Sequence, residues 1–597
     1  MNNNATGLGN DSAPNQITEK QLSSGSSPSG QDEQGHYHNE NYGKSSETVS
    51  FLGLTGVRLN LLIAICAGVG FVLFGYDQGV MGSLLTLPPF RMAFPQIDIT
   101  TPSAGDDPRL KGNPHNSSLQ GATIGIYEIG CFMGAVSCII WGNTLGRRRM
   151  IWIGSIMMLI GAILQVCSGE PGSEHGRMAM LWIGRIIAGI GNGQHTSTSE
   201  CSPPHNRGML IMIEGSLISF GIMISYWVDF ALYWAWKSNP NGPHANASWQ
   251  VPIAFQIVLI IPTFLTIWMP ESPRWLLLRG REQEARRVLS ALDCVPLNDA
   301  SIDLHVIEIK QSLELSASAS AKDMLKQGPN HNFHRVALGF VIQMFQQICG
   351  INLITYYAGT IFEQSIGLKP VESRILAACN GTEYFMASIL AIFMIERVGR
   401  RKLMIWCALG MACTMGILCA LLSHSALKMP TTDYDPSAAQ NKKPAIAACV
   451  FLFIFNTFFA IGWLGMTWLY PAECTPLSIR AQANGVSTSA NWLFNFMVVM
   501  ITPVAFANIH NYTYLIFAVI NLLMVPASWW IFPETAGRSL EEMDSIFARS
   551  SKWNPYSAVR IERETPRRYD KHGQLKEPLV SDTEQLEPVE SLNRAYQ

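Results

Sequence analysis

Apolar runs of membrane-spanning length recur along the chain between residues 59 and 532. They contain apolar stretches of about 18 to 25 residues, the length that an α-helix needs to cross a hydrocarbon core of roughly 30 Å. Twelve such runs stand out, six on each side of a polar, charge-rich stretch at 271–334. The predicted transmembrane helices lie at 59–87, 119–141, 149–168, 178–199, 209–235, 250–269, 335–363, 372–395, 403–423, 445–470, 481–507 and 511–532. This pattern predicts an all-α integral membrane protein.

The two ends of the chain differ from this apolar middle. Residues 1–57 are rich in Asn, Ser, Gly and Gln, and residues 549–597 are charged and contain proline. Such compositions bury too little apolar surface to fold, so we predict disordered tails. The 13 cysteines are scattered, mostly inside apolar runs, and show no metal-ligand spacing. We expect them to be packing residues, and we expect no metal and no cofactor.

Basic residues mark one side of the predicted membrane domain. They cluster in GRRR (146–149), NRG (206–208) and ERVGRRK (396–402), which share a side if the helices alternate in direction. Short loops rich in Lys and Arg stay in the cytoplasm, so this side and both tails are predicted to be cytoplasmic. The glycosylation sequons at Asn116 and Asn246 lie on the opposite side, which is consistent with this orientation.

An internal repeat divides the membrane domain into two halves. LGRRRM is repeated as VGRRKL, ECSPPHNRG as ECTPLSIRA, and PESPRWLL as PETAGRSLEE. The offsets, from 146 to 399, from 200 to 473 and from 270 to 533, are 253, 273 and 263 residues. Nearly constant offsets indicate two homologous six-helix halves. In such proteins a binding site lies near the bilayer midplane between the halves, and rocking of one half against the other gives alternating access.

These motifs resemble the sugar porter family of the major facilitator superfamily over residues 58 to 547. The resemblance rests on GRR in both halves, GR at 184–185, PESPRWL, QQICGINLITYY (346–357) and PETAGRSLEEMD (533–544). NGTEYF and WLYPAECTPLSIRA are most similar to a fungal branch that includes glycerol/proton symporters and hexose transporters. The resemblance implies the major facilitator fold, with twelve transmembrane helices in two pseudo-symmetric halves. The expected regions are a tail at 1–57, halves at 58–270 and 335–548, a cytoplasmic linker at 271–334 and a tail at 549–597.

A cluster of amides is the candidate substrate site. A sugar or polyol has many hydroxyl groups and no charge, so its site needs groups that donate and accept hydrogen bonds, beside aromatic faces. The amides of the seventh run share a helix face and match the family's sugar-contacting positions, as do residues of the tenth and eleventh runs. The alternative is that they only join helices. The candidate residues are Gln343, Gln346, Gln347, Asn352, Trp468, Asn491 and Asn495.

Several positions depart from the family's glucose porters. Ser219 stands where a Gln is usual, Ala460 where human-type carriers have Glu, and Tyr384 where Asn is usual. These losses weaken the case for glucose and fit a smaller or differently shaped polyol. The chain between Arg185 and Glu200 is also about five residues shorter than in the family, or roughly 7.5 Å of helix. That difference allows either local unwinding or impaired transport.

The charges at the predicted cytoplasmic side form a candidate gate. In the family, such pairs hold the inner side shut in the outward-open state. The alternative is ordinary positive-inside topology, with solvated charges that contribute little each. The candidate gate residues are Arg147, Arg148, Glu200, Glu271, Arg400, Arg401, Glu473 and Glu534.

Asp77, in FGYDQGVMG, is the one ionisable residue of its apolar run. A charge at membrane depth costs several kcal/mol unless it is paired or lines a wet cavity, which makes Asp77 a functional-site candidate. Its expected partner is Arg185 in the fourth run. In the family, the matching pair couples sugar binding to a proton, although some facilitators keep the Asp. Glu128 and Asp229 are secondary candidates, for which a structural role is the preferred interpretation.

The expected function is transport of a small, neutral, polyhydroxylated substrate across a membrane, coupled to a proton by alternating access. The alternatives are an uncoupled hexose facilitator and a nutrient sensor on the same fold. No nucleophile or metal cluster lies at membrane depth, so the sequence does not favour an enzyme. The expected partners are the substrate, the proton and the lipid bilayer, with no nucleic acid. The expected location is the plasma membrane.

Overall fold

The computed structural model describes residues 49–99, 113–169, 172–199, 207–238, 245–317, 321–328, 330–426, 442–551 and 553–567. Regular structure in these residues is helical, apart from one isolated bridge between Phe51 and Leu54. The first-half helices are α1 (Gly56–Leu84), α2 (Pro88–Ala93), η1 (Pro95–Ile97), η2 (Pro114–Asn116), α3 (Ser117–Leu145), α4 (Arg147–Cys167), α5 (Glu174–Ser199), α6 (Arg207–Ser238), α7 (Ala247–Ile260) and η4 (Ile261–Trp268). The linker holds α8 (Pro273–Leu278), α9 (Glu282–Asp293), α10 (Ala300–Ala317) and η5 (Ala321–Leu325). The second half holds α11 (Asn332–Ile348), α12 (Ile351–Thr360), η6 (Ile361–Ser365), α13 (Pro370–Val398), α14 (Arg400–Ala426), α15 (Lys442–Phe459), η7 (Ala460–Leu464), α16 (Met466–Cys474), α17 (Arg480–Ile509) and α18 (Tyr512–Ile531), followed by α19 (Leu540–Arg549) and α20 (Pro555–Glu564).

A helix lies at each of the twelve predicted spans. Among the described residues, eleven helical segments are long and apolar enough to cross a membrane. The helix outside that set is α5, which at 26 residues is about 39 Å long but carries several polar side chains. Large apolar side chains such as Trp406, Leu523 and Phe393 are more than 60% exposed, as expected of helices that face lipid. The chain is a multi-pass membrane protein.

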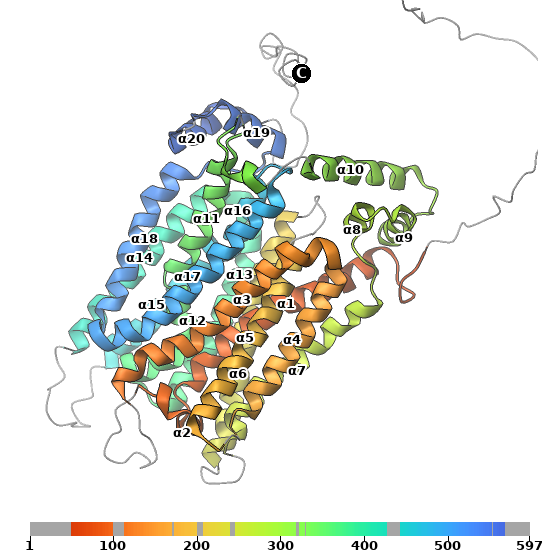
Figure 1. Ribbon diagram of the computed structural model, residues 1–597. Helices are drawn as coiled ribbons and strands as arrows, with labels where there is room; N and C mark the ends of the chain where they lie inside the picture. Colours follow the sequence, from red (N-terminus) through yellow and green to blue (C-terminus); the bar gives the residue numbers. More distant parts are fainter. Residues whose placement is uncertain are drawn as a thin grey trace, which may run out of the picture. The chain divides into compact units, whose positions relative to one another are not determined.

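The packing of helices repeats between the halves (Figure 1). In the first half α1 packs on α6, α3 on α5 and α4 on α7; in the second, α11 packs on α17, α13 on α15 and α14 on α18. The halves meet through α3 against α17, α13 against α6 and α1 against α12. The repeat relates α3 to α13 and α17 to α6, so the first two of these interfaces are equivalent to each other. The two homologous halves inferred from the repeated motifs are therefore present.

Glycines bring α5 close to its neighbours, and this explains where its polar residues can lie. A Cβ at Gly189 would come within 2.3 Å of the carbonyl oxygen of Tyr127, and one at Gly130 within 2.4 Å of that of Ile186. Small residues let membrane helices approach closely enough for backbone contact. The side chain of Arg185 in α5 therefore lies directly against α3 and is fully buried.

Two helices of the second half are discontinuous. Between α11 and α12 the chain turns at Gly350, whose φ of 106° favours glycine. Asn521 Nδ2 donates to the carbonyl oxygen of Cys349 at 2.7 Å, so a backbone group near the break has a partner. The π-helical turn η7 separates α15 from α16. Interrupted helices are where transporters of this architecture place substrate and ion sites.

Short helices cover one end of the bundle (Figure 1). The linker helices α8, α9 and α10 share a small apolar core that includes Trp275, Leu289 and Ile302. At the same end α19 and α20 follow the last membrane helix, and Tyr556 stacks on Trp529 with ring centroids 5.4 Å apart. The prediction of a disordered tail from 549 was thus wrong for 555–564, because Arg538 and Glu562 anchor α20 through a 2.9 Å ion pair. Residues 1–48 and 568–597 lie outside the described residues.

Candidate functional site

The predicted amides form one buried network between α11, α12 and α17. Asn491 Nδ2 donates to Gln343 Oε1 at 2.7 Å and to Gln346 Oε1 at 3.0 Å. Gln347 Nε2 donates to Gln346 Oε1 at 3.2 Å, and Asn352 Nδ2 donates to Gln347 Oε1 at 2.6 Å. The break at Gly350 is what allows residues on both sides of it to converge. Sequence reasoning predicted these residues, but not the break that brings them together.

The network is anchored on the π-helical turn η7. Gln346 Nε2 donates to the carbonyl oxygens of Trp463, at 3.2 Å, and Leu464, at 3.0 Å. Gln343 Nε2 donates to the carbonyl oxygen of Thr467 at 3.1 Å. These bonds pair buried carbonyl groups at and just after the π turn. Part of the amide cluster therefore has the helix-joining role that was the alternative interpretation. Asn491 Oδ1 has no hydrogen bond among the described residues, which leaves an acceptor for a ligand.

Trp468 lies apart from the hydrogen-bonded amides. Together with Gln343, Phe71 and Glu214, it lines a small cavity between the halves. The cavity measures about 20 Å³, which is room for a single water molecule. Asn495, one turn beyond Asn491, is buried and faces the carboxyl group of Glu128 across the interface. A sugar would fit only after the halves move apart.

The structure places Asp77 and Arg185 side by side in the first half. Arg185 Nη2 lies 3.8 Å from Asp77 Oδ2, and both side chains are at most 3% exposed. Arg185 Nη2 also donates to the carbonyl oxygen of Ile124 at 3.1 Å, and its guanidinium lies 5.3 Å from the centre of the Tyr127 ring. The separation of 3.8 Å is too long for a hydrogen bond, so the two side chains attract each other by charge alone, and only while Asp77 is ionised. Protonation of Asp77 would therefore break no direct hydrogen bond to Arg185.

Sequence reasoning missed Gln256 in α7. Its Nε2 donates to Asp77 Oδ1 at 2.9 Å, and it is the direct hydrogen-bond donor to that carboxylate. The signal that could have found it is an amide in the middle of the largely apolar sixth run, since a polar side chain at membrane depth needs a buried partner. Gln256 fixes the rotamer of Asp77, so that the other oxygen points to Arg185.

Six of the predicted gate residues form two equivalent helix caps, one in each half. Glu271 accepts hydrogen bonds from the backbone N–H groups of Arg147, at 2.8 Å, and Arg148, at 3.2 Å, at the start of α4. A carboxylate at this position pairs N–H groups left open by the helix and favours the positive end of the helix dipole. Gly146 has a φ of 88°, and a Cβ there would lie 2.9 Å from Glu271 Oε2. The glycine of GRR thus makes room for the cap.

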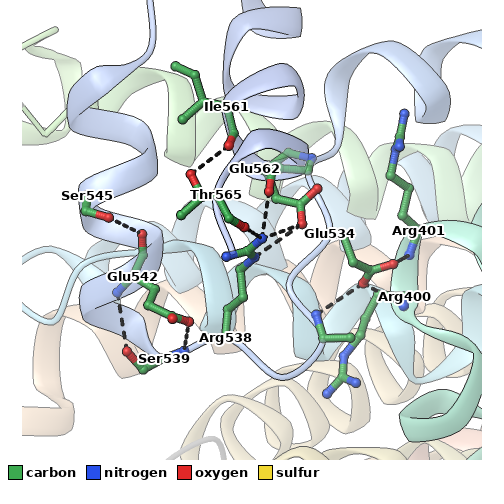
Figure 2. A network of polar contacts seen from close by, with 12 residues as sticks. Arg400, Arg401, Glu534, Arg538, Ser539, Glu542, Ser545, Ile561, Glu562 and Thr565 are labelled. Atoms are coloured by element: carbon green, nitrogen blue, oxygen red, sulfur yellow. Dashed lines mark hydrogen bonds and ion pairs between the residues drawn. The ribbon is translucent and has the colours of Figure 1, made fainter. Parts of the chain in front are cut away.

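The second half repeats this arrangement (Figure 2). Glu534 points at the start of α14 and accepts from the backbone N–H groups of Arg400, at 2.9 Å, and Arg401, at 3.1 Å. Arg400 Nη2 also pairs with Glu473 Oε1 at 2.9 Å. Beside them Arg538 binds Glu562 of α20 (Figure 2). Glu200, the counterpart of Glu473 in the first half, lies outside the described residues.

The backbone carbonyls at the ends of the sixth and twelfth spans bind the second arginine of each cap. Arg148 Nη1 donates to Met269 at 3.1 Å, and Arg401 Nη2 donates to Trp529. We call the end of the bundle that holds Arg147, Arg148, Arg400 and Arg401 the arginine end. Each of the cap contacts given above joins residues on the same side of the repeat, 147–271 or 400–534. The motif GRR and the motif PES or PET are therefore parts of one local structure.

The model of the family "Sugar (and other) transporter" matches residues 63–547. The chain belongs to this family. This transporter is 37% identical over 514 residues to "Sugar transporter STL1" of Saccharomyces cerevisiae, which covers 85% of this chain and 84% of that relative. It is 27% identical over 547 residues to a "Probable quinate permease" of Aspergillus terreus, covering 89% of this chain and 95% of the relative. A solved structure of the proton:xylose symporter XylE with bound 6-bromo-6-deoxy-D-glucose has a TM-score of 0.64 at 25% identity, covering 82% of this chain and 98% of that chain.

The three positions that depart from glucose porters are all buried in the transporter. Ser219 in α6 lies 2.9 Å, between Oγ atoms, from Ser388 in α13. Ala460 is buried at the start of η7, and Tyr384 is buried with its ring 6.0 Å from that of Phe459. The fourth span remains helical to Ser199, although the residues that follow, 200–206, lie outside the described part of the chain. The shortening therefore does not interrupt α5 as far as it is described.

Proposed function

We propose that this transporter carries a neutral sugar or polyol together with a proton across the plasma membrane, by alternating access, with both termini in the cytoplasm. The observation that carries the proposal is the position of the buried Asp77–Arg185 pair in one half, across from an amide network in the other half. The amides Gln343, Gln346, Gln347, Asn352, Asn491 and Asn495, with Trp468, form the proposed substrate site.

The chemistry of the amide network supports a neutral substrate. Amides donate and accept hydrogen bonds without charge, which suits hydroxyl groups. The relatives named above are a sugar transporter and a quinate permease, and quinate carries a carboxylate. The amide network contains no cation to pair with a carboxylate, which is why we favour an uncharged substrate.

The geometry of Asp77 supports proton coupling. Its pairing with Arg185 is electrostatic, so a proton on Asp77 releases Arg185 without breaking a hydrogen bond between them. The solved relative with a TM-score of 0.64 is a proton:xylose symporter. The alternative of an uncoupled facilitator is compatible with the same fold, because the pair could equally be a permanent structural contact.

Uptake in a transporter-deficient fungal cell tests both parts of the proposal. We expect the cell expressing this chain to accumulate labelled glycerol or a labelled hexose, and a protonophore to abolish uphill accumulation. Quinate, added as an unlabelled competitor, is expected to have no effect. Asp77→Asn mimics the protonated carboxyl and removes its titration, so it should abolish uphill accumulation and keep some downhill exchange. Uphill uptake by Asp77→Asn, or wild-type uptake that ignores the protonophore, would show that the transporter is not a symporter that uses Asp77.

A further inference from the structure

Glu128 in α3 is a second carboxyl buried at the interface of the two halves. It is fully buried, and the hydroxyl group of Tyr356, on α12 of the other half, donates a hydrogen bond to its Oε1. Its Oε2 has no hydrogen-bond partner among the described residues. The other groups that face it are Asp77 on α1, Arg185 on α5, Asn495 on α17, and Tyr127 and Cys131 on its own helix.

The charges of this cluster do not balance when every group is ionised. Asp77 and Glu128 are two buried carboxyls, and among the described residues Arg185 is the one buried cation that faces both. Arg185 is held on α3 by its bond to the carbonyl oxygen of Ile124, one turn before Glu128. A buried carboxylate without a compensating charge is strongly unfavourable, and it takes up a proton instead. The cluster is neutral when one of its two carboxyls holds a proton.

Two residues that lie against Glu128 are each one helical turn from a residue of the amide network. Tyr356 lies one helical turn after Asn352 on α12, and Asn495 lies one turn after Asn491 on α17. Glu128 is therefore a carboxyl of the first half that touches the second half next to the proposed substrate site. Any movement of α12 on substrate binding would change the hydrogen bond that Glu128 accepts from the Tyr356 hydroxyl.

We propose that Glu128 is a second proton-binding residue of the coupling site, and that Tyr356 ties its protonation to the position of α12. The inference rests on the proposed function. With α12 in place, the Tyr356 hydroxyl stabilises the Glu128 carboxylate, and the proton of the cluster is on Asp77. When α12 moves away, the O–H bond at Asp77 breaks and one forms at Glu128, with water carrying the proton. Asp77 then pairs with Arg185, and the net charge of the cluster is unchanged.

Two single variants separate this role from a purely structural one. Glu128→Gln keeps an acceptor for the Tyr356 hydroxyl and removes the ionisable group and its charge. With less negative charge beside it, Asp77 takes up a proton only at lower pH. We expect the pH midpoint of transport to fall by about one unit. Tyr356→Phe removes the donor to the carboxylate, so the cluster takes up its proton more readily and the midpoint should rise.

The measurement is counterflow of the labelled glycerol or hexose selected by the uptake experiment, into proteoliposomes of the full chain. The pH is equal on both sides and is varied from about pH 4 to pH 8, a range that brackets ordinary carboxyl titration. Because Tyr356 acts through Glu128, the double variant should show the midpoint of Glu128→Gln alone. Glu128→Asp keeps the charge, but its side chain is too short to reach the Tyr356 hydroxyl, so its midpoint should rise as in Tyr356→Phe. It serves as a second variant in case Glu128→Gln does not fold.

The outcomes distinguish this proposal from the proposed function. Counterflow needs no proton gradient, so its pH profile tests Glu128 even if uphill uptake by the wild type is absent. An unmoved midpoint in Glu128→Gln, a double variant whose shift is the sum of the two single shifts, or wild-type counterflow with no pH dependence would overturn the role of Glu128. If the wild type shows no uphill uptake but the two single variants shift the midpoint in opposite directions, the proposed proton symport is wrong and Glu128 is still a titrating residue.

Discussion

The two ends of the helical bundle are held in different ways. At the end away from the arginines, which we call the opposite end, side chains cross between the halves. Tyr226 donates to the carbonyl oxygen of Thr355 at 2.5 Å, and Arg374 Nη2 donates to Thr86 Oγ1 at 2.9 Å. The Arg374 guanidinium also lies 4.4 Å from the centre of the Tyr233 ring. At the arginine end, the contacts of the two Glu caps stay within their own halves.

This difference shows which contacts a transport cycle has to break. The caps at the arginine end make each half rigid and can persist while the halves rock. The contacts at the opposite end join the halves directly, so they must open before a substrate can enter from that end. The structure is therefore closed at the opposite end. If the arginine end is cytoplasmic, as predicted, the closed end faces outward.

The largest effect is expected from a bulky residue at the opposite end. A Cβ at Gly359 would lie 2.6 Å from the carbonyl oxygen of Gly82, so Gly359→Leu would force α12 away from α1. Overpacking of this kind costs about 1–3 kcal/mol, and 2.7 kcal/mol is about a hundredfold in an equilibrium. We expect uptake to fall by up to about a hundredfold with normal surface expression.

Gly416→Leu is the matched control, because a Cβ at Gly416 meets nothing within 4 Å. It should transport at the wild-type rate. If Gly359→Leu transports as well as Gly416→Leu, close packing at the opposite end is not needed for the cycle, and the contrast between the ends fails.

A smaller effect is expected midway between the ends. Gln347→Ala removes the bonds to Asn352 and Gln346 and takes the partner from the buried Nδ2 of Asn352, while Gln346 Oε1 keeps its bond from Asn491. Leaving a buried polar group unpaired costs about 1–3 kcal/mol, and about 1.4 kcal/mol is a factor of ten, so uptake at low substrate concentration should fall roughly tenfold. Here the loss should be in apparent affinity. Asn508→Ala, at an exposed amide, is the control, and a loss confined to maximal velocity would remove Gln347 from the substrate site.

The smallest effect is expected at the arginine end. Arg148→Ala and Arg401→Ala keep the backbone N–H groups that Glu271 and Glu534 cap, and remove only the side-chain bonds to Met269 and Trp529. One hydrogen bond is worth about 0.5–1.5 kcal/mol, so we expect transport to slow by about two- to tenfold with substrate affinity unchanged within a few-fold. The substrate affinities of the wild type and the two variants are compared by equilibrium ligand binding to the purified proteins. A large loss of affinity with normal turnover would place these arginines in the binding site.

Much of the fold was predictable because membrane insertion imposes strong local constraints. An apolar run long enough to cross the bilayer has to be a helix, so all twelve predicted spans coincide with helices within a few residues. The pairing of Asp77 with Arg185 was predictable for a related reason: a charge at membrane depth needs a partner, and α5 carries a strong cation. The helix α20 was not predictable in this way, because it is polar and depends on Arg538 and Trp529 for its place.

By itself, the sequence determined the number of spans, the two-half repeat and the residue types of the site, since hydropathy, repetition and buried charge are properties of the chain read in order. Only the tertiary structure decided how those residues meet. The break at Gly350, the π turn at 460–464 and the contact of Glu128 with Tyr356 depend on residues far apart in the sequence. It also decided that Glu271 and Glu534 accept hydrogen bonds from the backbone N–H groups of the arginines. Such contacts come from helix packing across and within the halves, which no local pattern encodes.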